Sequence, residues 1–451
     1  MRRRDVLLGA LGLGAGVTLS SLPALSPLSW AGSHPDLKDR YFIFCLFQGA
    51  WDVLLGLDPR DPAIFTPDAR RDTRIDVGYD LVEQTDAGLV RTRDPSMTFG
   101  PYIGRMADHV DKMAVIRGMD METVAHQVGV RRFLTGLPPA GQNARGSSTA
   151  TWLASLLAGQ ELVPNLVAGM ETYNVDQDVT YSGFRVASVR DLAASLATDP
   201  QTPTATEAER IQALLDDAAS CDRHARSEVR SAAHRARRAA AGLVENRLDR
   251  LFRFEANTPE MIALRAHYGF SANRLDSAGA RAAMAVTALA TGVSRVVSIR
   301  VNDGTLDTHQ GNWATDQGPN QRAAFDVVAA MVEDLASRPY KDTGESWLDH
   351  TTLVLHSDFT RTPLINASGG RDHHIMGCSA LIGAGIKPGI IGASSDVGME
   401  PQAVDLATGR VDLRGGEVIK PNHVMRTLYA SVGLEEDVSD QRAEPIRAAL
   451  R

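Results

Sequence analysis

Cysteine is scarce in this chain, which has three cysteines among its 451 residues: Cys45, Cys221 and Cys378. An odd and sparse set excludes a disulfide framework. Cys45 and Cys378 lie in apolar, strand-like segments and could be neighbours in a sheet. Buried free thiols are the simpler interpretation, because free cysteine packs like a small apolar residue.

The chain also lacks an excess of basic residues. It has 47 Lys and Arg against 55 Asp and Glu, which gives a formal net charge of -8 at pH 7. Nucleic-acid-binding domains carry a basic footprint, so we expect no nucleic-acid partner. The charged fraction of 23% and the apolar fraction of 43% are typical of a folded chain with a large core.

Long apolar runs are missing after the N-terminus, so we expect no transmembrane segment in the mature chain. At the N-terminus, arginines occupy positions 2–4, an apolar Gly/Ala-rich run covers 6–19, and Ser-Trp-Ala at 29–31 offers small residues for a signal peptidase. The apolar run is shorter than the ~20 residues that span a bilayer. We therefore predict a twin-arginine signal peptide over 1–31 and a periplasmic or secreted mature domain over 32–451.

Apolar, β-rich segments alternate with helical patterns along most of the chain. This alternation predicts an α/β fold, with a mostly parallel sheet and helices on both of its faces. Asn422 is expected to be the N-cap of the last helix, which Gly433 closes. The expected strands cover 41–47, 112–118, 162–168, 184–189, 295–301, 352–355 and 379–382, and the expected helices cover 126–136, 153–157, 282–291, 321–335 and 424–432.

One region has a different composition. Residues 207–254 are rich in Ala, Arg and Glu and contain no proline or turn cluster, so we interpret about 190–275 as a helical insertion. Its arginines favour a solvated helical face. The alternative is a surface that docks a co-exported protein partner. The arginines in question are Arg223, Arg226, Arg230, Arg235, Arg237 and Arg238.

Acidic and imidazole side chains follow several of the expected strands. In open α/β sheets the carboxyl ends of parallel strands meet at one edge, so these side chains are expected to converge there. Carboxylate oxygen and imidazole nitrogen are ligands of zinc, manganese and similar divalent metal ions. Helix capping and ordinary packing are the structural alternatives. The side chains are Asp52, His126, Asp307, His309, Asp358 and His373.

Several short motifs in combination resemble a known family. They are RRRDVL, GAWD, HxxxxxxFLTG, LDTHQGN, LVLHSDFTRTP and GRDHH. Together they look like the domain-of-unknown-function 1501 family of twin-arginine-exported bacterial proteins, which is similar to the alkaline phosphatase and sulfatase superfamily. The resemblance covers nearly the whole mature chain and is weak over 190–275. It implies an alkaline-phosphatase-like three-layer sandwich that holds one or two metal ions.

The resemblance also implies roles for individual residues. Its metal ligands fall on Asp52, Asp307, His309, Asp358 and His373. One departure is Phe359, which follows Asp358 where phosphatases have a histidine ligand, so a second ion would need Asp372 or His374 instead.

The nucleophile is a second departure. Counting back nine residues from Thr135 of the Thr-Gly pair leads to His126 rather than to a hydroxyl. A histidine can be a phosphoryl acceptor, a base or a metal ligand. Nearby hydroxyls that could replace it are those of Thr123, Ser147 and Ser148.

These observations predict an exported, metal-dependent hydrolase of phosphate or sulfate esters, acting on a small anionic ester substrate. Arg361 would bind the anionic group as a bidentate fork. The alternative is a catalytically inactive exported binding or assembly protein on the same scaffold, which the missing nucleophile and Phe359 favour.

Overall fold

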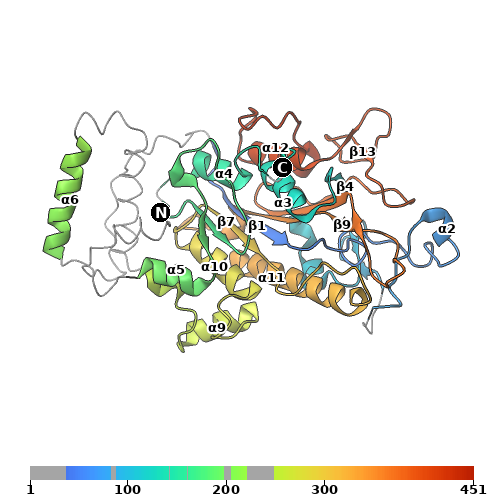
Figure 1. Cartoon of the computed structure of the whole chain (residues 1–451), viewed down its shortest axis with the longest axis horizontal. Coiled ribbons are helices and arrows are strands. Elements are labelled where there is room, and N and C mark those ends of the chain that lie inside the picture. The colour runs from blue at the N-terminus through green and yellow to red at the C-terminus, as the bar shows by residue number, and fades with distance from the viewer. Residues whose placement is uncertain (1–36, 83–87, 142, 160, 198–204, 221–247) are drawn as a thin grey trace.

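A computed structural model of the chain describes residues 37–82, 88–141, 143–159, 161–197, 205–220 and 248–451. Figure 1 shows the described elements in chain order. The predicted signal peptide, Cys221 and the arginine cluster between 223 and 238 lie outside these ranges. No helix within them is long and apolar enough to cross a membrane.

An eight-stranded sheet forms the centre of the molecule, in the order β12-β4-β11-β8-β1-β7-β5-β6. Only β11 runs antiparallel to its neighbours, and the other pairs are parallel. The predicted α/β class with a mostly parallel sheet is confirmed. The strands are β1 (Tyr41–Phe47), β4 (Met113–Asp120), β5 (Asn165–Ala168), β6 (Phe184–Val186), β7 (Val296–Arg300), β8 (Thr351–Ser357), β11 (Met376–Gly383) and β12 (Gly389–Ile391).

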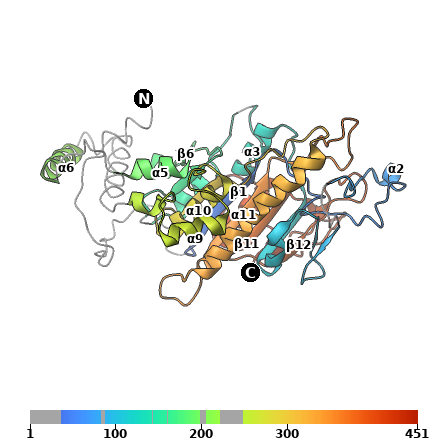
Figure 2. The ribbon, with the colours of Figure 1, turned by 90° about the horizontal axis from the view of Figure 1, so that it is seen from below.

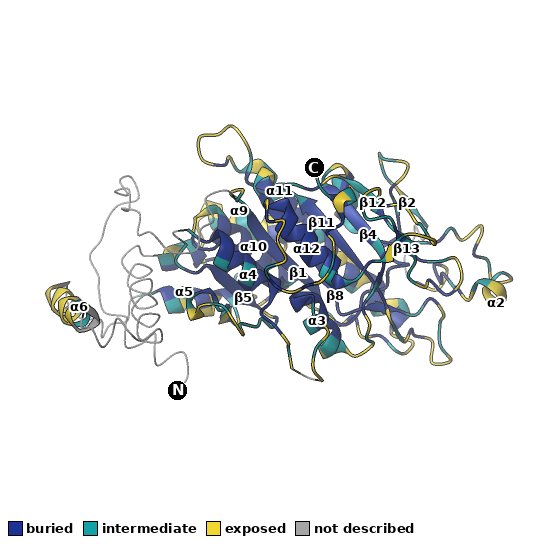
Figure 3. Ribbon diagram, turned by 90° about the horizontal axis from the view of Figure 1, so that it is seen from above, coloured by how far each residue is buried: buried dark blue, intermediate teal, exposed yellow. Residues whose placement is uncertain are grey.

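Helices cover both faces of this sheet (Figures 1 and 2). One face packs against α10 (Ala278–Ala290) and α11 (Gly318–Ser337), and the other against α3 (His126–Thr135), α4 (Thr149–Leu157) and α12 (Pro421–Ser431). Figure 3 shows that the sheet and these helices are mostly buried, whereas exposed residues gather in the loops and on α2 (Arg70–Thr73).

Strand β1 shows why the fold has three layers. All seven of its residues are buried, and side chains alternate between two faces along a strand. Ile43 belongs to the core cluster that contains Met284 of α10 and Phe325 of α11. Phe44 belongs to the other cluster, which contains Leu153 of α4 and Leu428 of α12. A continuous apolar run is therefore what a strand buried on both faces requires.

The remaining elements are short or lie beside the sheet. Helices α5, α6 and α9 belong to the region expected as a helical insertion. Among the described residues, the remaining α-helices are α5 (Val189–Leu196), α6 (Ala205–Ser220) and α9 (Pro259–Tyr268), and the remaining strands are β2 (Val90–Arg91), β3 (Thr98–Phe99), β9 (Thr360–Arg361), β10 (His373–His374), β13 (Ala403–Val404) and β14 (Glu417–Val418).

Two sequence expectations differ in detail from the structure. Asn422 is not the N-cap of α12, because the helix begins one residue earlier at Pro421, a residue type favoured at the first helical position. Cys45 and Cys378 are buried free thiols, as the simpler interpretation expected. They are not on neighbouring strands, because β8 lies between β1 and β11.

Candidate metal centre

Three histidines and one aspartate meet beyond the carboxyl ends of the strands. His126 is the first residue of α3, Asp307 and His309 lie in the loop after β7, and His373 begins β10. Strand β10 is held in place by its antiparallel pairing with β9, which opposes His373 to Arg361. The ligand atoms of the four residues all lie within 4.8 Å of one another, so the cluster could bind a metal ion.

Asp307 is the centre of this cluster. Its Oδ1 atom lies 3.0 Å from Nε2 of His309, 3.2 Å from Nε2 of His126 and 3.6 Å from Nε2 of His373. Nε2 of His309 is also 2.9 Å from Nε2 of His373. All three rings therefore present the same nitrogen to one carboxylate oxygen.

The opposite nitrogen of each ring faces a hydrogen-bond acceptor. Nδ1 of His126 lies 2.6 Å from the Asp358 carboxylate. Nδ1 of His309 lies 3.0 Å from the Asp372 carboxylate. Nδ1 of His373 lies 2.7 Å from the Val124 carbonyl oxygen. Each acceptor favours a proton on Nδ1, and a ring that carries only that proton offers a lone pair at Nε2. This is the usual arrangement of metal-binding histidines.

The cluster therefore fits a cation. Two imidazole lone pairs 2.9 Å apart, on His309 and His373, repel each other unless a proton or a metal ion lies between them. A proton on His373 is disfavoured, because burial and the nearby charge of His126 lower its pKa. A divalent ion that accepts nitrogen and oxygen ligands suits the position.

The site is open to solvent. The exposed fraction of the side chain is 29% for His126, 45% for Asp307, 38% for His309 and 25% for His373. Structural metal sites are closed, whereas catalytic sites keep a position that water or substrate can reach. Solvent access here agrees with the second kind.

Arg361 lies beneath the cluster with a fully buried side chain. Its Nη2 donates to Asp307 Oδ1 over 2.6 Å, and its other donors face His309 Nε2 and backbone carbonyls of the loops after β1 and β7. Burial would raise the pKa of Asp307, but the hydrogen bond and charge of Arg361 outweigh it and lower that pKa to about 2. Arg361 therefore orients an ionised Asp307, and all three guanidinium nitrogens of Arg361 have acceptors within the protein.

Asp358 is placed one contact away from the cluster. Its carboxylate accepts a hydrogen bond from the Gly49 backbone N–H as well as facing Nδ1 of His126. Burial lowers the pKa of His126, but the hydrogen bond and charge of Asp358, with the charge of Asp307, outweigh it, and the pKa is raised. The structure thus brings Asp358 to His126 as an orienting partner.

Asp52 lies outside the group of four. It is buried, forms an ion pair with Arg371 at 3.0 Å, and accepts a hydrogen bond from the Trp313 indole at 2.9 Å. The Arg371 guanidinium also lies 4.6 Å from the centre of the Trp313 ring. The charge of Asp52 is therefore already balanced by an internal cation.

Asp372 and His374, the two residues considered as ligands of a second ion, have different partners. Asp372 supports His309, whereas His374 accepts a hydrogen bond from the Met376 backbone, and burial lowers its pKa. Phe359 packs against the rings of His126 and His373, with centroid distances of 4.8 and 4.6 Å. Phe359 therefore gives the cluster an apolar wall.

Some supporting groups had no clear sequence signal. The Val124 carbonyl is a backbone atom, so its role could not be read from residue type.

Each of the three hydroxyls considered as nucleophiles accepts a hydrogen bond from a backbone N–H. Thr123 accepts from Ala125, Ser147 from Val175 and Ser148 from Tyr173.

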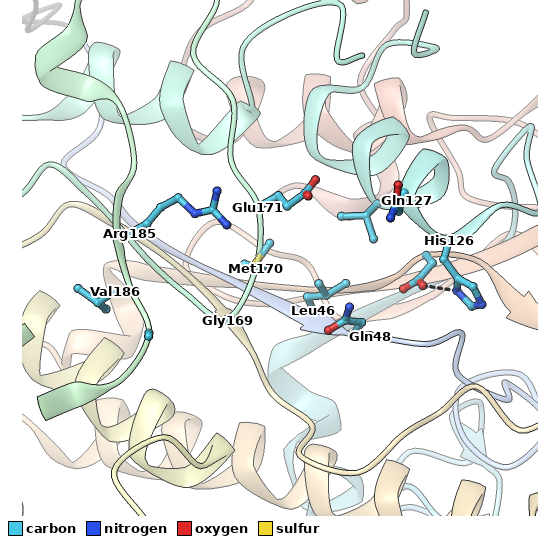
Figure 4. Close-up of a pocket in the computed structure, with 12 residues that line it drawn as sticks. Leu46, Gln48, His126, Gln127, Gly169, Met170, Glu171, Arg185 and Val186 are labelled. Atoms are coloured by element: carbon cyan, nitrogen blue, oxygen red, sulfur yellow. Dashed lines mark hydrogen bonds and ion pairs between the residues drawn. The ribbon is translucent and has the colours of Figure 1, made fainter. Parts of the chain in front are cut away.

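A cavity of about 500 Å³ adjoins the cluster through His126 and Asp358 (Figure 4). It extends over the ends of β1, β5 and β6. Its other lining residues are Leu46, Gln48, Gln127, Val130, Gly169, Met170, Glu171, Arg185, Val186 and Ala187.

Comparison with known proteins agrees with the family resemblance. A family model described as "Protein of unknown function (DUF1501)" matches residues 44–433. A solved structure of a protein in the alkaline phosphatase superfamily from Vibrio parahaemolyticus aligns with a TM-score of 0.38 and 10% identity, covering 98% of this chain and 78% of that one. No curated protein matches.

Proposed function

The chain belongs to the DUF1501 family of proteins of unknown function, and we propose that it is an exported, metal-dependent hydrolase of phosphate or sulfate esters. The observation that carries the proposal is the convergence of three imidazole Nε2 atoms on Asp307, in a solvent-accessible position beyond the carboxyl ends of the strands. The signal-like sequence at residues 1–31 supports export.

Within this proposal, Asp307, His309 and His373 hold the ion, and zinc or manganese suits their nitrogen and oxygen ligands. A bound divalent ion would polarise the ester oxygen and lower the pKa of an attacking group. Arg361 keeps Asp307 ionised and oriented toward the ion.

His126 is proposed as the general acid or base. It stands at the start of α3, and Asp358 fixes its Nδ1 at 2.6 Å. Its Nε2, which lies 3.2 Å from Asp307 Oδ1, is the atom that would exchange a proton with substrate or water. A carboxylate that holds an imidazole in one orientation is the same device that orients histidine in hydrolase triads.

A second candidate function has its own support. The hydroxyls of Ser147 and Ser148 are occupied by the loop at 173–176, and Phe359 occupies one wall of the cluster. This favours a catalytically inactive binding or assembly protein, which would bind a metal ion or an anion without turnover.

Elemental analysis of the exported protein, with two substitutions, tests these assignments. We expect His309→Ala to lose the bound metal and any esterase activity together. His126→Ala is expected to keep the metal and lose activity by about 100-fold or more, the usual contribution of a general acid or base. His350→Ala, which removes an imidazole paired with Glu345, is the matched control.

Purified exported protein without bound zinc or manganese would refute the hydrolase. Loss of metal in His126→Ala would make His126 a ligand instead. Full metal content without activity on a broad panel of phosphate and sulfate esters would favour the binding protein.

A further inference from the structure

The cavity beside the metal-binding cluster has one charge that no residue described by the structure balances. Of its charged lining groups, Asp358 bonds to His126, and Glu171 bonds to the Tyr173 hydroxyl and lies 3.5 Å from Arg131. The side chain of Arg185 forms no hydrogen bond or ion pair with any residue that the structure describes. A cation without a partner is therefore left in the cavity wall.

Arg185 lies at the far end of the cavity from the cluster. It is the exposed central residue of β6, the edge strand of the sheet, and Figure 4 shows it and His126 at opposite ends. Between them the cavity is lined by the apolar side chains of Leu46 and Met170, by the amides of Gln48 and Gln127 and by the carboxylate of Glu171. The wall thus passes from the metal-binding cluster across a mixed stretch of apolar and polar side chains to the Arg185 guanidinium.

We propose that this cavity binds the organic part of the substrate, and that Arg185 recognises a second oxyanion at its far end. The inference rests on the proposed function, since the ester group would lie at the cluster. A guanidinium pairs with carboxylate or phosphate through two parallel hydrogen bonds. Arg361 is not suited to this role, because its three nitrogens already face protein acceptors.

The dimensions of the cavity agree with such a substrate. A volume of about 500 Å³ lies within the range of small-molecule sites, which are mostly apolar with a few placed polar groups. A short spacer between two anionic ends matches the positions of the cluster and Arg185 at opposite ends of the cavity, with Leu46 and Met170 between them. The substrate class is therefore a small organic monoester that carries a carboxylate or a second phosphate.

Binding of non-hydrolysable phosphonates tests this proposal without requiring turnover. Zinc-loaded exported protein is titrated calorimetrically with alkyl phosphonates, ω-carboxyalkyl phosphonates and α,ω-bisphosphonates of matched, increasing chain length. At one spacer length, a second anion is expected to tighten binding by about five- to tenfold. Comparison of the carboxylate and bisphosphonate series identifies which oxyanion is preferred.

Arg185→Gln is expected to abolish this advantage while the metal content and the affinity for plain alkyl phosphonates stay unchanged. Arg185→Lys should retain part of it, because the charge remains and the fork is lost. Arg190→Gln is the matched control, since Arg190 is also exposed and does not line the cavity. It should behave like the unmodified protein.

The outcomes separate this inference from the proposed function. If plain phosphonates bind in a manner that His309→Ala abolishes, but a second anion adds nothing or its advantage survives Arg185→Gln, the Arg185 subsite is wrong and the metal site stands. An Arg185-dependent advantage without hydrolysis of the corresponding phosphate and sulfate esters supports the subsite and refutes the hydrolase. Absence of binding by every phosphonate overturns both.

Discussion

At the scale of single residues, the cluster depends on groups that hold its ligands rather than on the ligands alone. Each of the three imidazoles has a separate acceptor at Nδ1, contributed by Asp358, Asp372 or the Val124 carbonyl. Two of these acceptors are side chains that can be altered without removing a ligand. The orienting partners of histidine ligands tune metal affinity almost as strongly as the ligands do.

Asp372→Asn tests this dependence. The amide oxygen can still accept a hydrogen bond from His309 Nδ1–H, but it carries no charge, so the orientation of the ring is weakened. We expect zinc affinity to fall by about 10- to 100-fold, measured by competition with a chromophoric chelator at pH 7. Asp342→Asn, at an exposed position away from the cluster, is the control. Unchanged affinity in Asp372→Asn would remove Asp372 from the site.

His356 makes a second residue-scale prediction, about stability rather than chemistry. It is buried in β8, stacks on Phe133 at 4.2 Å, and neither ring nitrogen has a hydrogen-bond partner among the described residues. Burial lowers its pKa from 6.5 to about 3. The unfolded chain therefore binds a proton below about pH 6.5 that the folded chain does not, so stability falls as the pH falls toward 3.

His356→Leu removes the imidazole whose protonation in the unfolded chain lowers the stability at low pH. Between pH 7 and pH 5 the unmodified protein is expected to lose about 2 kcal/mol more of its free energy of unfolding than His356→Leu does. Urea denaturation of chelator-treated samples at both pH values measures the difference. Parallel losses in the two proteins would show that His356 is protonated when folded.

At the scale of elements, the position of α3 decides where His126 stands. The helix begins at His126 and approaches the loop after β8 closely at Gly129. A Cβ atom at Gly129 would lie 2.2 Å from the Asp358 carbonyl oxygen, far inside van der Waals contact. Glycine at this position therefore allows His126 and Asp358 to meet.

Gly129→Ala should displace α3 from β8. We expect a destabilisation of about 1–3 kcal/mol, typical of overpacking, measured by urea denaturation. The His126 pKa, followed by NMR in chelator-treated protein, should fall as the Asp358 contact opens. Gly88→Ala is the control, because a Cβ there meets no atom of the described residues within 4 Å. Stability and a His126 pKa equal to those of the unmodified protein would mean that the helix does not depend on this approach.

At the scale of the whole molecule, the cluster joins segments that are remote in sequence. His126 opens α3, Asp307 and His309 follow β7, and His373 belongs to the β9–β10 pair. An ion bound by these groups stabilises only the folded chain, because the unfolded chain does not bring them together. The effect of metal removal on stability therefore tests whether the ion binds at the cluster of the folded chain.

We expect chelation to lower the Tm by a few degrees. An ion present at a hundred times its Kd stabilises the folded state by about 2.7 kcal/mol. Differential scanning calorimetry with excess zinc and with chelator measures the shift. His309→Ala should show the same Tm under both conditions, and an equal Tm for the unmodified protein would contradict ion binding at the folded cluster.

The sequence alone determined the α/β class, the buried run of β1 and the start of α3 at His126, because these depend on local periodicity, propensity and capping. It also predicted that Asp307 and His309 share a site with the loop residue His373, since the carboxyl ends of parallel strands share an edge. Only the tertiary structure separated Asp52, paired with Arg371, and Asp358, paired with His126, from the cluster. It alone also showed that the donors of Arg361 face protein acceptors while Arg185 has no partner among the described residues. The physical reason is that strand topology brings side chains to an edge, whereas their pairing depends on distances between segments hundreds of residues apart.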